Sequence, residues 1–234
     1  MNHPSITRIC ENDMVDRLLS EPGGLNRIIN ISGFPSDGVA LTRVPLDDVP
    51  AKPDNNGDVD ILLVGENRPE DSVAIEVKRL TVPAAAVRSL SVYNVGELKK
   101  AGEQASKLAR IGFARAYLYA FVAVDTREQN AGTDSWNGAP MEVRGMIENE
   151  LRMRRPELDP RVGLYVPSFT QPVDEAPLVA GSFHGHLHRP ATPVRQSLQL
   201  TKWIAQKVIS HPHRIISSGS RFAAHNSIRF AITP

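Results

Sequence analysis

Two short apolar runs, each interrupted by charged residues, limit most strongly what this chain can fold into. The runs are 58–64 (DVDILLV) and 72–78 (SVAIEVK), and the polar stretch 65–71 (GENRPED) separates them. A strand, a polar loop and a second strand are typical of a β-hairpin. Burying charged groups without partners is expensive, so the charged residues of these runs must reach solvent or face a group of opposite charge.

Side-chain alternation places the charged residues of the two runs on one face of the hairpin. Residues i and i+2 share a face in a strand, and a turn near Arg68 sets Asp60 opposite Glu76 and Asp58 opposite Lys78. Two carboxylates directly opposite each other destabilise a strand pair by up to ~1 kcal/mol. A divalent cation bound by both would offset this, and hard cations such as Mg²⁺ prefer oxygen ligands.

A metal ion at this position would suit the hydrolysis of phosphodiester bonds. Such an ion can bind a phosphoryl oxygen, lower the pKa of a bound water and stabilise the charge of the transition state. Lys78 would lie near that water or phosphate. The alternative is an exposed sheet face with a cross-strand salt bridge, which stabilises a protein very little. Opposed carboxylates do not suit a structural pair, so we favour the metal site.

The rest of the chain predicts a mixed α/β protein, and 41% apolar residues are enough for a hydrophobic core. The segment 96–112 has the 3.6-residue apolar period of a helix, and 116–125 has the composition of a buried strand. The segment 25–34 fits either a short helix or a strand. The other expected elements are helices at 12–19, 139–155 and 194–210, the last with Trp203 in the core, and strands at 39–46 and 161–169.

The pattern of Asp60, fifteen further residues and then Glu76-x-Lys78 resembles the motif of the PD-(D/E)xK nuclease superfamily. The resemblance covers roughly residues 6–125. It implies a restriction-endonuclease-like fold, in which helices flank a mixed central sheet built from a helix, a three-stranded meander, a helix and a strand. We therefore expect a nuclease core at 1–130 and a C-terminal α/β elaboration at 131–234 packed on it. The literal "PD" of Pro53 and Asp54 lies in turn-rich sequence, so we favour Asp60 as the motif's aspartate.

The resemblance also implies roles for individual residues. Asp60 and Glu76 would ligate Mg²⁺ (or Mn²⁺) together with the backbone carbonyl of Val77, and Lys78 would position or activate water. Many members of the family add a glutamine on the helix after the lysine, and Gln104 matches it.

Two further acidic residues are candidates for a supporting role. Family members often carry an acidic residue on the first helix, which Glu11 matches, and Asp58 shares a strand face with Asp60. Each supporting residue has a plainer explanation. Gln104 fits an ordinary surface position on a helix, and Glu11 fits a solvated carboxylate that suits the helix dipole.

The charge of the chain is unevenly distributed. Residues 1–78 carry 7 Lys/Arg and 14 Asp/Glu, whereas no acidic residue follows Glu175. An acidic front half and a basic tail suit a metal site beside a surface that binds a polyanion. We therefore expect Arg189, Arg195 and Lys202 to contact nucleic acid, with a solvated basic face as the alternative.

Three alternating histidines, His184, His186 and His188, would share one face of a strand. Imidazoles at this spacing can bind zinc or copper. More often such a row is the polar side of a half-buried strand, with Phe183 and Leu187 packed inward. A third option is that protonated histidines contact phosphates.

These features together predict a metal-dependent nuclease that cuts DNA rather than RNA, either internally or from ends. The alternative is a catalytically inactive module of the same fold that binds nucleic acid or protein. The resemblance also implies a possible homodimer. The single cysteine, Cys10, and a longest uncharged apolar run of nine residues at 116–124 favour a cytoplasmic protein without a membrane segment.

Overall fold

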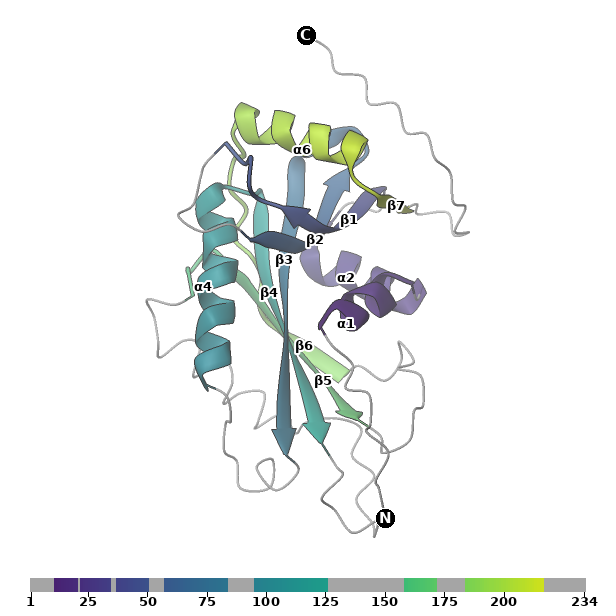
Figure 1. The fold of residues 1–234 in the computed structure, drawn as a ribbon, viewed down its shortest axis with the longest axis vertical. Helices are drawn as coiled ribbons and strands as arrows, with labels where there is room; N and C mark the ends of the chain where they lie inside the picture. The colour runs from purple at the N-terminus through teal and green to yellow at the C-terminus, as the bar shows by residue number, and fades with distance from the viewer. Residues whose placement is uncertain are drawn as a thin grey trace.

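A mixed β-sheet is the centre of the molecule (Figure 1). The computed structural model describes residues 11–20, 22–34, 37–50, 57–83, 95–125, 158–171 and 184–216. Within these ranges seven strands form one open sheet, packed against four helices. The elements in chain order are α1 (Glu11–Ser20), α2 (Pro22–Ser32), β1 (Gly38–Pro45), β2 (Asp58–Gly65), β3 (Arg68–Pro83), α4 (Val95–Ile111), β4 (Arg115–Asp125), β5 (Gly163–Gln171), β6 (His184–Arg189), α6 (Leu198–Ser210) and β7 (His213–Ile216).

The strand order across the sheet is β6-β5-β4-β3-β2-β1-β7. The pairs β1–β2, β2–β3, β1–β7 and β5–β6 are antiparallel, whereas β3–β4 and β4–β5 are parallel. A parallel neighbour requires a crossover connection, and α4 lies between β3 and β4 in the chain. The order helix, three-stranded meander, helix and strand is therefore present, as the sequence predicts.

Most of the predicted elements are confirmed. The segments expected at 96–112, 116–125 and 161–169 correspond to α4, β4 and β5, and 25–34, which fitted a helix or a strand, lies mostly in α2. The expected helix at 139–155 lies outside the described residues. Residues 163–216 add β5, β6 and β7 to the same sheet as β1–β4.

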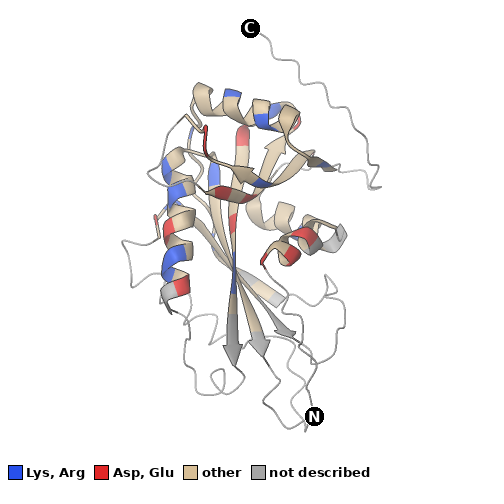
Figure 2. Ribbon diagram, in the orientation of Figure 1, with Lys and Arg blue, Asp and Glu red and all other residues tan. Residues whose placement is uncertain are grey.

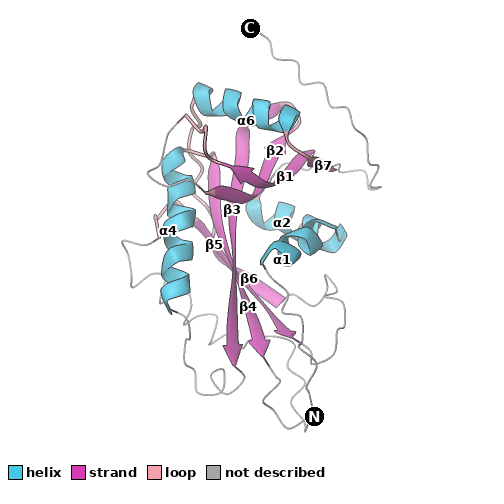
Figure 3. Ribbon diagram, viewed as in Figure 1, coloured by secondary structure: helices cyan, strands magenta, loops and turns pink. Residues whose placement is uncertain are grey.

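Helices cover both faces of the sheet (Figure 3). Alternate residues of β2 belong to opposite apolar layers. Ile61 and Leu63 pack in the layer that contains α1 and α2, and Leu62 and Val64 pack in the layer that contains α4 and α6. The two-residue period of a strand thus explains why both faces of this sheet are buried. None of the described helices combines the length and the apolar character that crossing a membrane requires.

The helix α4 buries one apolar stripe against the sheet. Leu98, Ala101, Ala105 and Leu108 are each no more than 2% exposed and follow the helical period. The helix ends at Gly112, which has φ +95 and donates its N–H to the carbonyl of Leu108 at 3.3 Å. Glycine adopts this left-handed conformation readily, so Gly112 ends α4 at the turn that leads into β4.

A buried glutamine joins α6 to the sheet. The side chain of Gln196 accepts a hydrogen bond from Ser72 Oγ at 2.5 Å and donates to the carbonyl of Pro69 at 3.0 Å and to Thr201 Oγ1 at 2.9 Å. The next turns of α6 bury Trp203, as the sequence predicts, with 4% of its surface exposed. These contacts fix α6 over the start of β3.

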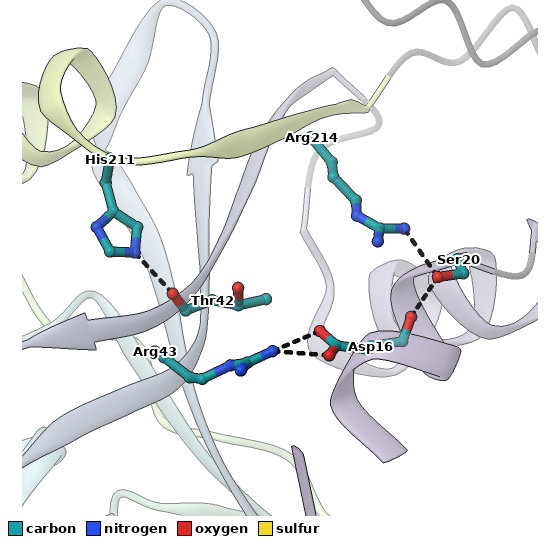
Figure 4. Close-up of polar contacts among 6 residues, drawn as sticks. All are labelled: Asp16, Ser20, Thr42, Arg43, His211 and Arg214. Carbon is teal, nitrogen blue, oxygen red and sulfur yellow. Dashed lines mark hydrogen bonds and ion pairs between the residues drawn. The ribbon is translucent and has the colours of Figure 1, made fainter. Parts of the chain in front are cut away.

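Basic residues of β7 and β1 hold α1 against the sheet edge (Figure 4). Arg43 Nη2 donates to both carboxylate oxygens of Asp16 at 2.7 Å, and Arg214 Nη1 donates to Ser20 Oγ at 3.1 Å. His211 Nε2 lies 2.8 Å from the carbonyl oxygen of Thr42.

The uneven charge of the sequence is therefore explained in part by contacts within the fold. Lys207 forms an ion pair with Asp48 at 2.9 Å, which adds to the contacts that Arg214 and Arg43 make with α1. Basic residues of the tail thus contact the acidic front half of the same chain.

Candidate active site

The β2–β3 hairpin adopts the register that the sequence predicts. Ile61 pairs with Ile75, and continuing this register by one residue places Asp60 opposite Glu76. By alternation both carboxylates point to the face of the sheet that α4 covers, because Leu62 and Ala74 pack in that layer. The two acidic residues of the motif are therefore neighbours on adjacent strands.

The turn of the hairpin is tighter than predicted. It contains only Glu66 and Asn67, and Gly65 pairs with Arg68 after a register shift that follows Leu63. The polar residues 68–71, expected in a loop, lie in β3. These residues are exposed or half-buried, so polar side chains can occupy the strand there at little cost.

Two carboxylates take over as hydrogen-bond acceptors where β2 leaves β3. The regular pairing of β2 with β3 ends at Ile75, and the next N–H on that side, from Val77, donates to Asp60 Oδ2 at 2.6 Å. The following one, from Arg79, donates to Glu11 Oε1 at 3.2 Å. Asp60 and Glu11 are thus held in place by the backbone of β3.

Glu76 is a buried carboxylate without a partner among the described residues. Glu76 is 5% exposed, and within the described ranges its side chain forms neither a hydrogen bond nor an ion pair. The pKa of Glu76 is raised to about 9, first by burial and then by the nearby carboxylates of Asp60 and Asp58, while the charge of Lys78 acts in the opposite direction. A cation bound beside Glu76 would lower this pKa and favour the ionised carboxylate.

Asp60 shares this environment. Burial raises the pKa of Asp60 to about 6, while the hydrogen bond from Val77 opposes the shift and the charge of Asp58 adds to it. Asp58 itself is exposed at the start of β2. The N–H of Val77 donates to Oδ2 of Asp60 only. Within the described part of the chain, Oδ1 therefore accepts no hydrogen bond.

Lys78 is held between two helices rather than against Asp60 and Glu76. Its Nζ lies 2.9 Å from Glu11 Oε1 on α1 and 3.3 Å from Glu97 Oε2 on α4. Burial alone would lower the pKa of Lys78, but the hydrogen bonds to Glu11 and Glu97 outweigh it and raise the pKa above its ordinary value. Lys78 is therefore an ammonium group at neutral pH.

A groove with a volume of about 640 Å³ opens beside these residues. Its lining includes Asp58, Glu76 and Gln104, whereas Asp60 and Lys78 are not part of the lining. Gln104 thus lies beside the candidate site, and its side chain is exposed on α4. The other lining residues are Leu46, Gly57, Lys100, Glu103, Lys107, Leu108 and Arg110.

The donor groups fit a magnesium ion better than a metal that requires many protein ligands. In the described part of the chain, no three His, Cys, Asp or Glu side chains are grouped so that they could hold a metal ion together. Asp60 and Glu76 would supply two carboxylates, and the carbonyl of Val77 stays a predicted ligand. Mg²⁺ is often bound by one or two carboxylates and completes its shell with water and substrate phosphates.

The predicted nucleic-acid contacts of the C-terminal segment do not line the groove. Arg189 Nε donates to the carbonyl of Val162 at 2.8 Å and its Nη2 to that of Asp159 at 3.2 Å, so this guanidinium supports the backbone around β5. Arg195 and Lys202 are exposed near and on α6. The basic residues that do line the groove come from α4 (Figure 2).

The histidine row lies on the edge strand β6. A register shift opposite Leu164 and Tyr165 leaves His188 as an extra residue, which interrupts strict alternation. Leu187, expected to pack inward, is 40% exposed because it lies at the sheet edge, so that expectation is wrong. The side chains of His184 and His186, and residue 183, lie outside the described part.

Sequence reasoning missed Glu97, which contacts Lys78, and the basic residues of α4. The signal for Glu97 was an acidic residue in the first turn of a predicted helix, immediately after the strand that carries Lys78.

The fold and these residues define an α/β protein whose central sheet carries two adjacent carboxyl groups beside a groove, that of Glu76 buried and that of Asp60 half-buried. No family model matches the chain, and comparisons with curated proteins and with solved structures found no match.

Proposed function

We propose that this protein is a metal-dependent nuclease that hydrolyses phosphodiester bonds, those of DNA in preference to RNA. The observation that carries the proposal is Glu76, a nearly fully buried carboxyl group that forms no ion pair within the described part of the chain and that lines an open groove. Asp60 lies across from it on the neighbouring strand in the predicted register. A cation bound between these two carboxyl groups would favour their ionised forms and offset their mutual repulsion.

The order of elements supports a restriction-endonuclease-like fold. Helices α1 and α2, the meander β1–β2–β3, helix α4 and strand β4 follow one another in the chain, and β4 lies parallel to β3. The motif residues lie on β2 and β3, at the centre of this arrangement. Order and motif position together favour the PD-(D/E)xK class.

Each residue has a role that follows from its surroundings. Asp60 and Glu76 would hold the cation, with the carbonyl of Val77 as a further ligand. A bound Mg²⁺ supplies polarisation of a phosphoryl oxygen and a water of lowered pKa. Lys78, held as an ammonium group by Glu11, would steady the phosphate electrostatically rather than remove a proton from water.

Cleavage assays with matched variants test the proposal. Linear and circular DNA, and RNA of the same sequence, are incubated with Mg²⁺ or Mn²⁺ and compared with EDTA. We expect metal-dependent cleavage of DNA that Asp60→Ala and Lys78→Ala abolish, while Glu66→Ala, an exposed acidic residue of the hairpin turn, retains it. Full cleavage by either site variant, or none by the native protein with either metal, contradicts the proposal.

A second candidate is a module of the same fold that binds nucleic acid or protein without turnover. The observation that favours it is the engagement of the motif side chains in structural contacts. Lys78 pairs with Glu11 and Glu97, and Asp60 accepts the N–H of Val77. Calorimetric titration of Mn²⁺ separates the two candidates: binding that Glu76→Gln abolishes supports the nuclease, and its absence supports the module.

A further inference from the structure

One wall of the groove is formed by a basic face of α4. Lys100, Lys107 and Arg110 line the groove, and the spacings of seven and three residues place them on one side of the helix. Glu103 lines the groove from the same helix, so this face carries three cations and one carboxylate. Asp58 and Glu76 line the same groove from the sheet. Three cations therefore stand across from the acidic residues of the candidate site.

The reach of Lys107 brings this basic face close to the site. A Cβ atom added to Gly57 would lie 3.6 Å from Lys107 Nζ, so the ammonium group extends to the residue that precedes Asp58. Lys100 is exposed, with 69% of its side chain accessible, and its Nζ lies 3.3 Å from Glu97. The basic face thus runs from the first turns of α4 to its last turn.

The length of this face suits a nucleic-acid backbone. Ten residues separate Lys100 from Arg110, which corresponds to about 15 Å at the rise of an α-helix. A DNA strand carries a phosphate roughly every 3.4 Å of helix axis, so the face spans about four phosphates. A small anion would not require three cations distributed over this distance.

We propose that α4 is the wall of the groove that contacts the phosphates of a DNA strand, through Lys100, Lys107 and Arg110. The inference rests on the proposed function for the identity of the polyanion. It assigns the contact surface to α4 in place of the C-terminal residues Arg195 and Lys202, which do not line the groove.

The test compares two triple variants that remove the same number of positive charges. The groove variant carries Lys100→Gln, Lys107→Gln and Arg110→Gln. The control variant carries Lys99→Gln, Arg195→Gln and Lys202→Gln, at exposed positions that do not line the groove. Fluorescence anisotropy of labelled DNA, single-stranded and duplex, is measured over a range of salt concentrations with EDTA, and circular dichroism checks that both variants are folded.

Counterion release sets the expected result. For three lost phosphate contacts, the slope of log K against log salt should become shallower by about 2 for the single strand or about 2.7 for the duplex. The control variant should keep the native slope. An unchanged slope in the groove variant, or equal changes in both variants, overturns the inference. A native protein that binds DNA through α4 but cleaves none with Mg²⁺ or Mn²⁺ contradicts only the nuclease activity.

Discussion

The ammonium group of Lys78 lies 2.9 Å from Oε1 of Glu11, and the same oxygen accepts the backbone N–H of Arg79 at 3.2 Å. One carboxylate at the start of α1 thus neutralises a half-buried charge on β3 and satisfies a backbone donor of the same strand. Because Glu11 is the first residue of α1, these contacts also set where that helix meets the sheet.

Two substitutions of Glu11 should separate the contribution of its charge from that of its hydrogen bond with the N–H of Arg79. Glu11→Gln removes the charge but keeps an oxygen that can accept the N–H of Arg79, whereas Glu11→Ala removes both. We expect Glu11→Ala to lower the free energy of unfolding by about 1 to 2 kcal/mol, and Glu11→Gln to lower it by less. Urea unfolding measures both, with Glu66→Ala as the control. Equal values for the alanine and glutamine variants would show that the N–H of Arg79 does not depend on this contact.

The stability of the metal-free protein should fall as pH rises. Burial raises the pKa of Glu76 to about 9 and that of Asp60 to about 6, above the values of about 4 in an unfolded chain. Between about pH 4 and pH 9 these groups bind more protons in the folded protein than in the unfolded chain. Their contribution to the free energy of unfolding therefore decreases as pH rises. The contribution is full below about pH 4 and is lost through about pH 9.

The variant Glu76→Gln isolates the larger part of this dependence. Its amide does not titrate, so its stability relative to the native protein should increase steadily between about pH 5 and 9. Urea unfolding in EDTA at several pH values measures the difference. A difference that stays constant with pH would mean that Glu76 is ionised in the folded protein at neutral pH.

The buried amide of Gln196 should contribute more to stability than its neighbour on α6. Gln196→Ala leaves the hydroxyl of Ser72 and the carbonyl of Pro69 without this partner, which we expect to lower the free energy of unfolding by about 2 kcal/mol. Gln199→Ala, at an exposed position in the first turn of α6, should change it by less than about 0.5 kcal/mol. Chemical denaturation of the two variants makes the comparison, and similar losses would mean that Gln196 does not anchor α6.

Arg43 combines a favourable ion pair with an unfavourable backbone conformation. It has φ +53 and donates to both oxygens of Asp16. Both Arg43→Ala and Arg43→Gly lose the ion pair, but glycine adopts positive φ without the penalty of about 1 kcal/mol that alanine has there. We therefore expect the glycine variant to be more stable than the alanine variant by about that amount in thermal unfolding. The reverse order would mean that β1 relaxes to another conformation at this residue.

The register of the hairpin could be predicted because one-residue shifts are strongly excluded there. A one-residue slip of β2 would move Asp60 away from Glu76 to the opposite face of the sheet, where its carboxylate would lie in the apolar layer that contains α1 and α2. The position of the turn could not be predicted in the same way. The register shifts by three residues between Leu63 and Gly65, and no apolar pattern in 65–71 marks where the shift lies.

The partners of Lys78 and the walls of the groove were less accessible to sequence reasoning. The apolar period of α4 shows which side of the helix is buried, and Leu98 and Leu108 are buried as expected. The period does not show at which height along the sheet the helix packs. The position of α4 along the sheet determines that Glu97 contacts Lys78 and that Lys107 extends to Gly57.

The side chains of Asp60 and Glu11 stand where β3 would otherwise present free backbone donors. An open strand edge is a template for strands of other molecules and so a starting point for aggregation. Here each donor is already occupied, and the occupying groups are acidic and resist the approach of another edge of like charge. Asp60, which we assign to cation binding, and Glu11 thus also keep separate copies of the protein from joining their sheets at this point.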